Sequence, residues 1–276
     1  MRTELHFHLL PGVDDGPVDD QEAIDLARLA VEDGTSCVVA TPHVRLVEVE
    51  ALDGVTARLQ AVLRDAGIGL ELHSGGELAP DDVGSLDQSQ LELLAHGPPG
   101  ARWLLLEAPL VGGEGTLQAA ARELRHRGFD VLIGHPERSP ATSLPTLRLE
   151  VEQGAVLQLN ASSVTGDHGM QAREKALSLV RTGLPFVLAS DAHSPARPPQ
   201  LTAAAAVLDA VGIEDGRVRA AVDLAPGAML RDGLSAARTA RGPGPHGGRS
   251  RLGQRERATP AVARSAQIFL DRRRGA

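Results

Sequence analysis

Two histidines separated by one residue, His6 and His8, stand near the beginning of the chain, and two carboxylates, Asp14 and Asp15, follow them. The pattern of residues 5–8 predicts a short strand, on which alternate side chains share one face, so that both imidazoles point the same way. Two imidazoles on one face can bind a divalent cation, and the carboxylates that follow suggest a site for more than one metal ion. The alternative interpretation is an exposed edge strand whose two histidines are solvated.

Further side chains of this chemistry follow other predicted strands. Short apolar runs predict buried strands at residues 37–40, 70–73, 103–106, 131–133, 156–159 and 186–189. The polar residues that follow these strands are His43, Glu77, Glu107, His135, Asn160, Asp191 and His193. One histidine at a strand end is more often structural than a ligand. Five at equivalent positions, together with four carboxylates, favour a metal cluster, because buried charges are costly unless a cation compensates them. Mixed imidazole and carboxylate ligands suit Zn²⁺, Mn²⁺ or Fe²⁺ better than Ca²⁺.

Some candidate groups lack this placement. Cys37 lies inside a predicted buried strand, where we interpret it as a packing residue. The histidines that we interpret as ordinary surface or loop residues are His73, His96, His126, His168 and His246.

The elements that position the strand ends alternate between strand and helix. Helical patterns cover residues 20–33, 55–66, 117–127, 145–153 and 171–182, and each is followed by a glycine. The first of them is expected to bury Ala23, Ile24, Ala27, Ala30 and Val31. This alternation predicts an α/β fold with a parallel sheet. Functional residues at the ends of seven strands favour a closed or nearly closed (β/α) barrel over a doubly wound open sheet.

The composition indicates an intracellular globular protein. Of the 276 residues, 42% are apolar, which is enough for a sizeable core. One cysteine excludes internal disulfides and fits a reducing compartment. No apolar run approaches the roughly 20 residues of a membrane span, and the first residues lack the apolar segment of a signal peptide. We therefore expect a cytoplasmic protein without a membrane span.

The net charge of −8 is unevenly distributed along the chain. Residues 238–276 hold ten arginines against two acidic residues, a balance of +8, so residues 1–237 carry −16. The acidic part argues against nucleic acid as a partner. We expect a single catalytic domain over residues 1–236 and a disordered tail rich in Arg, Gly and Pro over residues 237–276.

The motifs together resemble a known family. They are HFHLLPGVDDGP (6–17), ATPH (40–43), GGEL (75–78), LLEAP (105–109), GHPER (134–138), LNASSVTG (159–166) and ASDAH (189–193). Over residues 4–232 the chain resembles the PHP (polymerase and histidinol phosphatase) superfamily. Within it, the chain looks like the manganese-dependent protein-tyrosine phosphatases of bacterial capsule and exopolysaccharide loci.

The resemblance implies a distorted, TIM-like (β/α)7 barrel with three divalent metal ions, most often Mn²⁺, with Fe, Zn, Co or Mg as alternatives. The first metal ion would be held by His6, His8, Glu77 and Asp191. The second would share Glu77 and add Glu107 and His135, and the third would be held by Asp15, His43 and His193. The same resemblance makes Arg138 the phosphate-binding residue and, with Asp15, His43 and His193, a catalytic residue. Asp14 would support the ligands from behind.

The implied reaction is hydrolysis of phosphotyrosine by a metal-activated hydroxide. The implied substrate is a phosphotyrosine protein, most plausibly a bacterial tyrosine autokinase that controls polysaccharide export. Because this chain has no tyrosine, the substrate must be another molecule. Two departures from the family pattern put substrate preference in doubt: the loop after His43 is short and lacks aromatic residues, and Ser139 replaces a common aromatic residue.

Four other functions are alternatives to the hydrolysis of phosphotyrosine. A phosphatase for a small phosphate monoester such as histidinol phosphate is the main alternative. An amidohydrolase would need a lysine on a strand, but Lys175 is in a predicted helix. A cysteine-dependent phosphatase would need Cys-x5-Arg, and His43 occupies the arginine position. A non-catalytic binding module would not need an intact set of ligands.

Overall fold

The structure is a computed structural model that describes residues 2–113 and 115–239. Its strands are β1 (Arg2–Phe7), β2 (Thr35–Ala40), β3 (Glu71–Ser74), β4 (Glu77–Leu78), β5 (Trp103–Glu107), β6 (Asp130–Gly134), β7 (Val156–Asn160) and β8 (Phe186–Ala189). All neighbouring strands pair in parallel, in a three-stranded sheet of order β1-β2-β3 and a five-stranded sheet of order β4-β5-β6-β7-β8. The expected parallel α/β architecture is confirmed.

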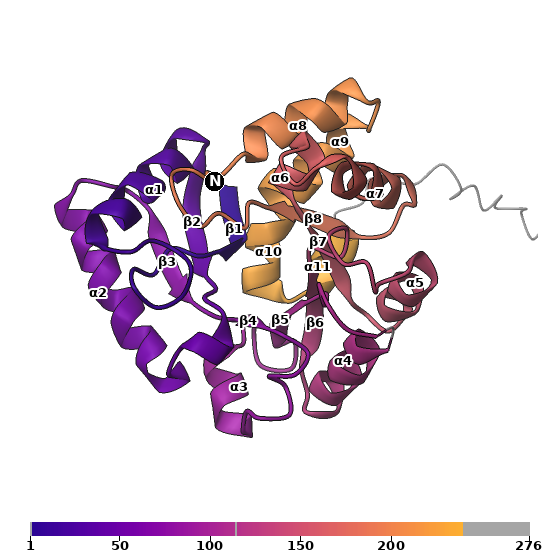
Figure 1. Cartoon of the computed structure of the whole chain (residues 1–276), viewed down its shortest axis with the longest axis horizontal. Coiled ribbons are helices and arrows are strands. Elements are labelled where there is room, and N and C mark those ends of the chain that lie inside the picture. Colours follow the sequence, from indigo (N-terminus) through magenta and orange to yellow (C-terminus); the bar gives the residue numbers. More distant parts are fainter. Residues whose placement is uncertain (1, 114, 240–276) are drawn as a thin grey trace, which may run out of the picture. The chain divides into compact units, whose positions relative to one another are not determined.

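Helices connect the strands and cover their outer faces. They are α1 (Asp20–Glu32), α2 (Leu52–Asp65), α3 (Gln88–Leu94), α4 (Thr116–His126), α5 (Leu144–Glu152), α6 (Ala161–Thr165), α7 (Met170–Arg181), α8 (Leu201–Ala210), α9 (Asp215–Arg219), α10 (Ala225–Asp232) and α11 (Ser235–Thr239). Short 3₁₀ turns η1 (Val44–Leu46) and η2 (Val49–Ala51) follow β2, and a π-helical turn, η3 (Ala220–Leu224), joins α9 to α10. In Figure 1, α1 and α2 flank the first sheet, α4, α5 and α7 flank the second, and α10 lies between them.

Helix α1 shows how the apolar pattern selects the buried face. Ala23, Ala27 and Ala30 are buried as expected, and Leu26 joins them. Val31 is 40% exposed, so its expected burial was wrong. At 3.6 residues per turn, Val31 stands about 80° around the helix from Ala23, at the margin of the buried stripe.

The two sheets meet at two seams, each closed by an isolated parallel bridge. Phe7 bridges Ala192 beyond the end of β8, and His43 bridges Glu77 beyond the end of β2. Backbone bonds from His8 N to Ala192 O (2.9 Å) and from Glu77 N to Pro42 O (3.0 Å) support the two bridges. The first seam closes at the carboxyl ends of β1 and β8, and the second joins the segment beyond the carboxyl end of β2 to the first residue of β4.

The third predicted strand is two strands, because the chain bends at Gly75 and Gly76. β3 before the bend pairs with β2, and β4 after it pairs with β5. A Cβ atom on Gly75 would lie 2.6 Å from His96 Nε2, and one on Gly76 would lie 2.6 Å from Val44 Cγ2. Only glycine fits these approaches, and the bend carries Glu77 to the seam.

The pairing of strand β1 with β2 is irregular, and neighbouring side chains of β1 have different surroundings. Glu4 pairs with Val38 and Phe7 with Ala40, so three steps along β1 match two along β2. At this bulge the consecutive side chains of Leu5 and His6 are both buried, and they pack against different residues. Leu5 joins an inner apolar cluster with Trp103 of β5 and residues of α10 and α11, whereas His6 reaches the polar centre described below.

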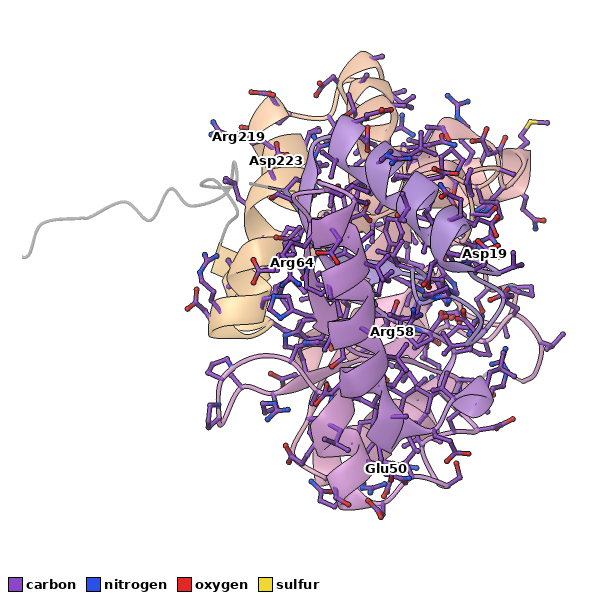
Figure 2. All side chains as sticks on the ribbon, turned by 90° about the vertical axis from the view of Figure 1, so that its left-hand side faces the viewer. Asp19, Glu50, Arg58, Arg64, Arg219 and Asp223 are labelled. Carbon is purple, nitrogen blue, oxygen red and sulfur yellow. The ribbon has the colours of Figure 1, made fainter. Side chains whose placement is uncertain are left out.

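Ion pairs tie the outer helices together, and Figure 2 shows this face of the chain. Arg58 Nη1 of α2 lies 2.8 Å from Asp20 Oδ2 of α1, and both side chains are about half exposed. Pairs of this kind contribute little to stability, so the burial of apolar faces holds these helices in place.

The expected C-terminal boundary of the domain lies close to the last described residue. The boundary expected at residue 237 falls inside α11, where Leu234 and Ala237 pack in the inner apolar cluster. Residues 240–276, which make up nearly all of the expected tail, lie outside the described residues, so the tail stays a prediction. Among the described helices, none has the length and apolar character needed to cross a membrane.

Candidate metal centre

The structure brings the expected metal-binding residues together where the seams close. Eight of the nine fall into three overlapping groups whose ligand atoms lie within 4.8 Å of one another. The groups are His8, Asp15, His43 and His193; His6, Glu77 and His135; and His6, His8 and Asp191. The ninth residue, Glu107, lies at the margin, with its Oε1 atom 4.0 Å from His135 Nε2.

Glu77 lies at the middle of the assembly and is almost fully buried. Its Oε1 atom lies 2.9 Å from His135 Nε2 and 3.3 Å from His6 Nε2. Its Oε2 atom lies 3.0 Å from His43 Nδ1 and 3.3 Å from His8 Nε2. One carboxylate therefore contacts imidazoles from both sheets, as a bridging ligand must.

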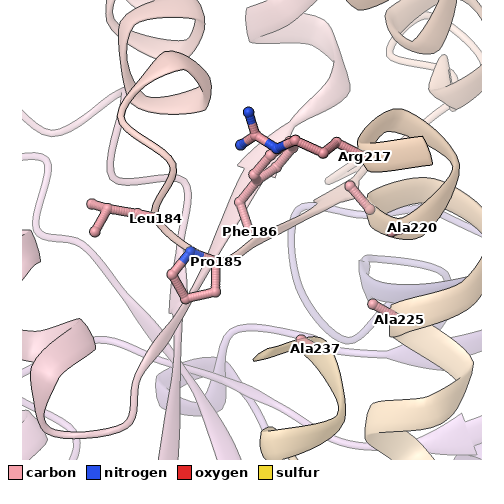
Figure 3. Close-up of a pocket in the computed structure, with 8 residues that line it drawn as sticks. Leu184, Pro185, Phe186, Arg217, Ala220, Ala225 and Ala237 are labelled. Atoms are coloured by element: carbon pink, nitrogen blue, oxygen red, sulfur yellow. The ribbon is translucent and has the colours of Figure 1, made fainter. Parts of the chain in front are cut away.

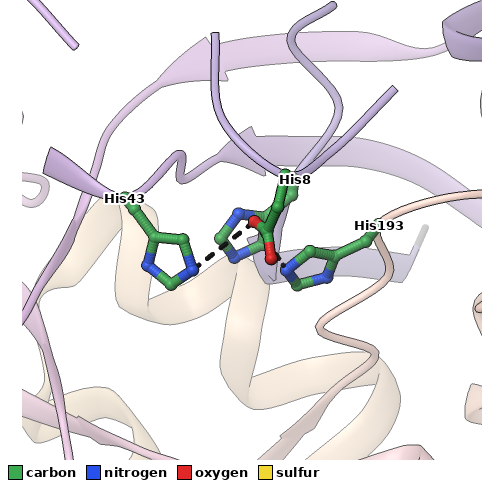
Figure 4. Close-up of side chains that lie close together, drawn as sticks. His8, His43 and His193 are labelled. Atoms are coloured by element: carbon green, nitrogen blue, oxygen red, sulfur yellow. Dashed lines mark ion pairs between the residues drawn. The ribbon is translucent and has the colours of Figure 1, made fainter. Parts of the chain in front are cut away.

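Asp15 lies between the imidazoles of His43 and His193, which Figure 4 labels together with His8. Its Oδ1 atom is 3.3 Å from His193 Nε2 and 3.5 Å from His43 Nε2. The His193 ring also stacks on His8, with 3.8 Å between ring centroids. The side chain of Asp15 is 58% exposed, so this part of the centre faces solvent.

A surrounding layer of polar groups fixes the direction of the imidazoles. His8 Nδ1 lies 2.6 Å from Asp14 Oδ2, and His6 Nδ1 lies 2.9 Å from Gln158 Oε1. His193 Nδ1 lies 2.9 Å from the carbonyl oxygen of Asp191. Since each acceptor oxygen requires a proton on Nδ1, each of these rings presents the Nε2 lone pair to the centre. The supporting position expected for Asp14 agrees with this arrangement.

Gln158 was not singled out in the sequence analysis, and Asn160 was named only as the polar residue that follows its strand. Gln158 Oε1 also accepts a bond from the backbone N–H of His135 (3.1 Å), and its Nε2 donates to Asn160 Oδ1 (2.8 Å). Asn160 Nδ2 donates to Asp191 Oδ2 (2.7 Å). The available signal was the polar alternation at positions 158 and 160 of an otherwise apolar strand.

Two of the centre's residues have a strained backbone. His135 has φ 30° and Asp191 has φ 52°, and they are the non-glycine residues with positive φ in the described part of the chain. Such conformations cost on the order of 1–3 kcal/mol each and persist where the surrounding structure enforces them. Their coincidence with predicted ligands supports a functional centre at this place.

The electrostatics of the centre suit a bound cation. Burial acts to raise the pKa of Glu77, but the neighbouring His6 and His135 outweigh it and hold that pKa well below its usual value. Burial acts to lower the pKa of His8, yet Asp14, Asp191 and Glu77 raise it well above its usual value. Glu77 therefore favours the ionised form and His8 a positive charge, and a metal ion can replace the proton of His8.

Buried polar atoms that lack hydrogen-bond partners indicate whether the residues of this centre could bind metal ions. Glu77 Oε2 and His43 Nδ1 are buried without a hydrogen-bond partner, although they lie only 3.0 Å apart. His6 Nε2 and His8 Nε2 face each other at 3.3 Å. Buried polar atoms normally find partners, and donor atoms that converge without hydrogen bonds can be satisfied by a shared cation. The residues fit the metal ions that the resemblance implies.

A cavity of about 240 Å³ opens beside these residues. Arg138 lines it and donates from Nη1 to Asp191 Oδ2 (2.8 Å). Sequence reasoning missed Arg45, Leu110 and Arg197, which also line it. Arg45 belongs to the short turn η1 and the other two belong to loops after strands, where no periodic pattern reveals which side chains turn inward.

Two histidines differ from their expected ordinary surface character. His96 forms a backbone bridge with Trp103, and its Nε2 atom is buried without a partner. Burial lowers the pKa of His96 to about 3. His168 is half-buried beside Ser163, and burial lowers its pKa to about 4. His73 and His126 are exposed enough to fit the expectation, and His246 lies outside the described residues.

A small cavity lies at the other end of β8 and is lined mainly by apolar residues, as Figure 3 shows. The Arg217 guanidinium carbon lies 5.7 Å from the centroid of the Phe186 ring at this place. At about 30 Å³ the cavity holds about one water molecule, so it is not a substrate site.

Comparisons with known proteins agree with the geometry. A family model described as capsular polysaccharide synthesis, CpsB/CapC, matches residues 2–219. The putative tyrosine-protein phosphatase CapC of Staphylococcus aureus is 32% identical over 200 residues, covering 70% of this chain and 77% of that protein. The tyrosine-protein phosphatase YwqE of Bacillus subtilis is 30% identical over 197 residues, covering 69% and 77%.

Solved structures extend the comparison to the fold. A crystal structure from the pair YwqE of Bacillus subtilis and CpsB of Streptococcus pneumoniae, described as metal-dependent tyrosine phosphatases, matches with a TM-score of 0.72. It is 27% identical and covers 83% of this chain and 94% of that chain. The phosphotriesterase homology protein of Escherichia coli matches with a TM-score of 0.58 at 14% identity, over 80% and 96%, which is a likeness of fold alone.

Proposed function

Because this chain belongs to the capsular polysaccharide synthesis CpsB/CapC family, we propose that it is a metal-dependent protein-tyrosine phosphatase acting in capsule or exopolysaccharide synthesis. The observation that carries the proposal is the convergence of five imidazoles and three carboxylates in three groups, within each of which the ligand atoms lie within 4.8 Å of one another. The enzyme class is phosphoric monoester hydrolase, as in the tyrosine-protein phosphatases that the chain resembles.

We propose the following assignment of ligands. His6, His8, Glu77 and Asp191 hold one divalent ion, Glu77 is shared with a second ion that Glu107 and His135 complete, and Asp15, His43 and His193 hold a third. Mn²⁺ is the proposed metal. The grouping of His43 and His193 with Asp15, and of His135 with Glu77, supports this division. We also propose that the eight strands form one distorted (β/α)7 barrel whose third strand is split in two, since both seams carry bridges.

The chain's own residues prepare the reaction. When bound, the metal ions supply an activated water and neutralise charge on the phosphoryl oxygens. Asp14 and Gln158 hold the Nδ1 protons of His8 and His6, which keeps both Nε2 atoms available as ligands. Asp191 positions the Arg138 guanidinium at the cavity, where it can bind two phosphoryl oxygens at once. A phenolate, with a pKa of about 10, leaves with less protonation than an alkoxide.

The surroundings of the cavity support an extended phosphopeptide as substrate. Two further grooves adjoin it, with volumes of about 570 and 420 Å³. Leu110 lines the cavity and both grooves, and it is 39% exposed. Val111 beside it is 88% exposed and lines the second groove. These side chains offer an apolar contact for a tyrosine ring whose phosphate reaches Arg138, in place of the aromatic residues that the loops lack.

We further propose that the substrate is a bacterial tyrosine autokinase, which would act in the cytoplasm with this enzyme. The absence of tyrosine from this chain means that the phosphotyrosine comes from another protein. A single thiol, Cys37, suits a reducing compartment.

The test is a comparison of kcat/KM for a phosphotyrosine peptide, a phosphoserine peptide and histidinol phosphate with the Mn²⁺-loaded enzyme. We expect the phosphotyrosine peptide to be the best substrate. Leu110→Ala should raise KM for that peptide about threefold to tenfold and change kcat less, because it removes part of an apolar contact. Leu149→Ala on the exposed face of α5 is the matched control. Faster turnover of histidinol phosphate would assign the enzyme to small metabolites instead.

A further inference from the structure

A second group of metal-binding side chains occurs away from the nine proposed ligands. Among the described residues it consists of Cys37 on β2 and Glu71 and His73 on β3, with ligand atoms within 4.8 Å of one another. His73 Nε2 lies 3.2 Å from Glu71 Oε1. The thiol side is buried, with Cys37 4% exposed, while the His73 and Glu71 side chains are 42% and 57% exposed. A cation could therefore enter from solvent and meet the thiol at the inner side.

The backbone fixes these positions relative to one another. In the parallel pair of β2 and β3, Cys37 is the register partner of Glu71, and Val39 is the partner of His73. Glu71 and His73 are two residues apart, so both lie on one face of the strand. Gln60 of α2 binds the other edge of β3 by donating to Leu70 O and accepting from Leu72 N, both at 2.8 Å. The ligand atoms of the three side chains already lie within 4.8 Å of one another.

We propose that Cys37, Glu71 and His73 form a separate metal site for a borderline-soft divalent cation such as Zn²⁺. One thiolate, one imidazole and one carboxylate are a ligand set that Zn²⁺ accepts, with a fourth position left for water. Mn²⁺ prefers oxygen and nitrogen ligands, so the thiol makes this site differ in selectivity from the catalytic centre. The occupied site joins β2 to β3, which is the last strand before the Gly75-Gly76 bend.

Binding at this site releases a proton. Burial and the nearby Glu71 charge raise the pKa of the Cys37 thiol to about 11, so the free thiol is protonated at neutral pH. The cation forms a bond to sulfur as the S–H proton leaves to water, with no change in oxidation state. Affinity therefore increases with pH through the neutral range, since fewer protons compete for the sulfur.

Co²⁺ provides a sharp test, because a thiolate bound to Co²⁺ gives a charge-transfer absorption in the near ultraviolet. Cys37 is the single cysteine of the chain, so any such band identifies this site. The full chain, stripped of metal, is titrated with Co²⁺ beyond the amount that fills the catalytic centre. We expect the band in the unchanged protein and its loss in Cys37→Ser. His73→Gln and Glu71→Gln should each weaken Co²⁺ binding, followed by this band, about tenfold or more.

Matched controls separate this site from the catalytic centre. His126→Gln and Glu123→Gln alter exposed residues of α4 and should leave the band unchanged. Cys37→Ser should keep its Mn²⁺-dependent phosphatase activity, because Cys37 contacts no proposed catalytic ligand in the structure. If Cys37→Ser does not fold, His73→Gln still decides the question, since that side chain is 42% exposed and can be changed with less effect on packing. Absence of the band in the unchanged protein, or a band that neither His73→Gln nor Glu71→Gln weakens, would overturn the proposal.

Discussion

At the scale of single residues, Glu77 has the greatest expected effect. It contacts four imidazoles, so Glu77→Gln removes one negative charge from the middle of the centre. We expect kcat on an aryl phosphate to fall about a hundredfold or more and bound metal to decrease, because ligand changes exceed the usual effect of supporting groups. Activity and metal content are measured together, with the exposed Glu123→Gln as control. An enzyme that keeps its metal and its rate would exclude a bridging role.

Arg138 allows a test of geometry as well as charge. Its guanidinium is 24% exposed at the cavity and is held by Asp191. Arg138→Ala should lower kcat/KM about tenfold to a hundredfold, since a hydrogen bond to a charged group contributes about 1.5–3 kcal/mol. Arg138→Lys should recover only part of this loss, because an ammonium group cannot bind two oxygens in one plane. Equal rates for Lys and Arg would show that charge alone is needed.

The proposed ligands could be chosen from the sequence because they stand at the ends of apolar strands, and parallel strands gather their carboxyl ends at one place. The side chains that surround them could not be predicted in the same way. Leu110 and Arg197 come from loops of irregular conformation, and Arg45 comes from the short turn η1. The role of Gln158 could not be predicted, because a polar residue in a strand can have several roles and the sequence does not show its hydrogen-bond partners.

At the scale of elements, the bend after β3 packs against His96, and protonation of His96 should make the stability of the fold sensitive to acid. His96 packs against the bend, and its folded-state pKa of about 3 lies below the ordinary value of 6.5. The unfolded chain therefore binds a proton between these values and the folded chain does not, so stability decreases as pH falls below 6.5. From pH 7 to pH 5 the loss from this group is at most about 2 kcal/mol, because the unfolded chain gains nearly one proton in this interval.

The measurement is the free energy of unfolding in urea at pH 7 and at pH 5. His96→Gln cannot gain a proton, so the difference between the two pH values should be smaller in this variant than in the unchanged protein. His126→Gln on α4 serves as the control and should preserve the difference. If the two variants respond alike, protonation of other groups causes the acid sensitivity.

The order of the strands and helices could be predicted from the sequence, but the division between β3 and β4 could not. Buried parallel strands are continuous apolar runs, and each of the seven predicted strands is present at its place. The division between β3 and β4 was not predicted, because it depends on the approach of Val44, Leu94 and His96 to two glycines. The pair Gly75-Gly76 was the local signal, and its meaning depends on neighbours that are distant along the chain.

At the scale of the whole described chain, metal binding should stabilise the fold. The proposed ligands come from both sheets and lie beside both seams. A site held at about a hundred times its dissociation constant adds about 2.7 kcal/mol, so removal of metal by a chelator should lower Tm by about 5–10 °C per site. Calorimetry with chelator and with added Mn²⁺ measures this shift. In Glu77→Gln the chelator should cause a smaller shift, and an equal shift in both proteins would place the stabilising ions elsewhere.

The closure of the first seam by Phe7 and Ala192 has a consequence for biosynthesis. His6 and His8 leave the ribosome early, whereas Asp191 and His193 are made about 185 residues later. A nascent chain can form β1, β2 and the helix between them, but it holds only part of the ligand set. Loading of the proposed centre must therefore wait until Asp191 and His193, which follow the eighth strand, have been translated.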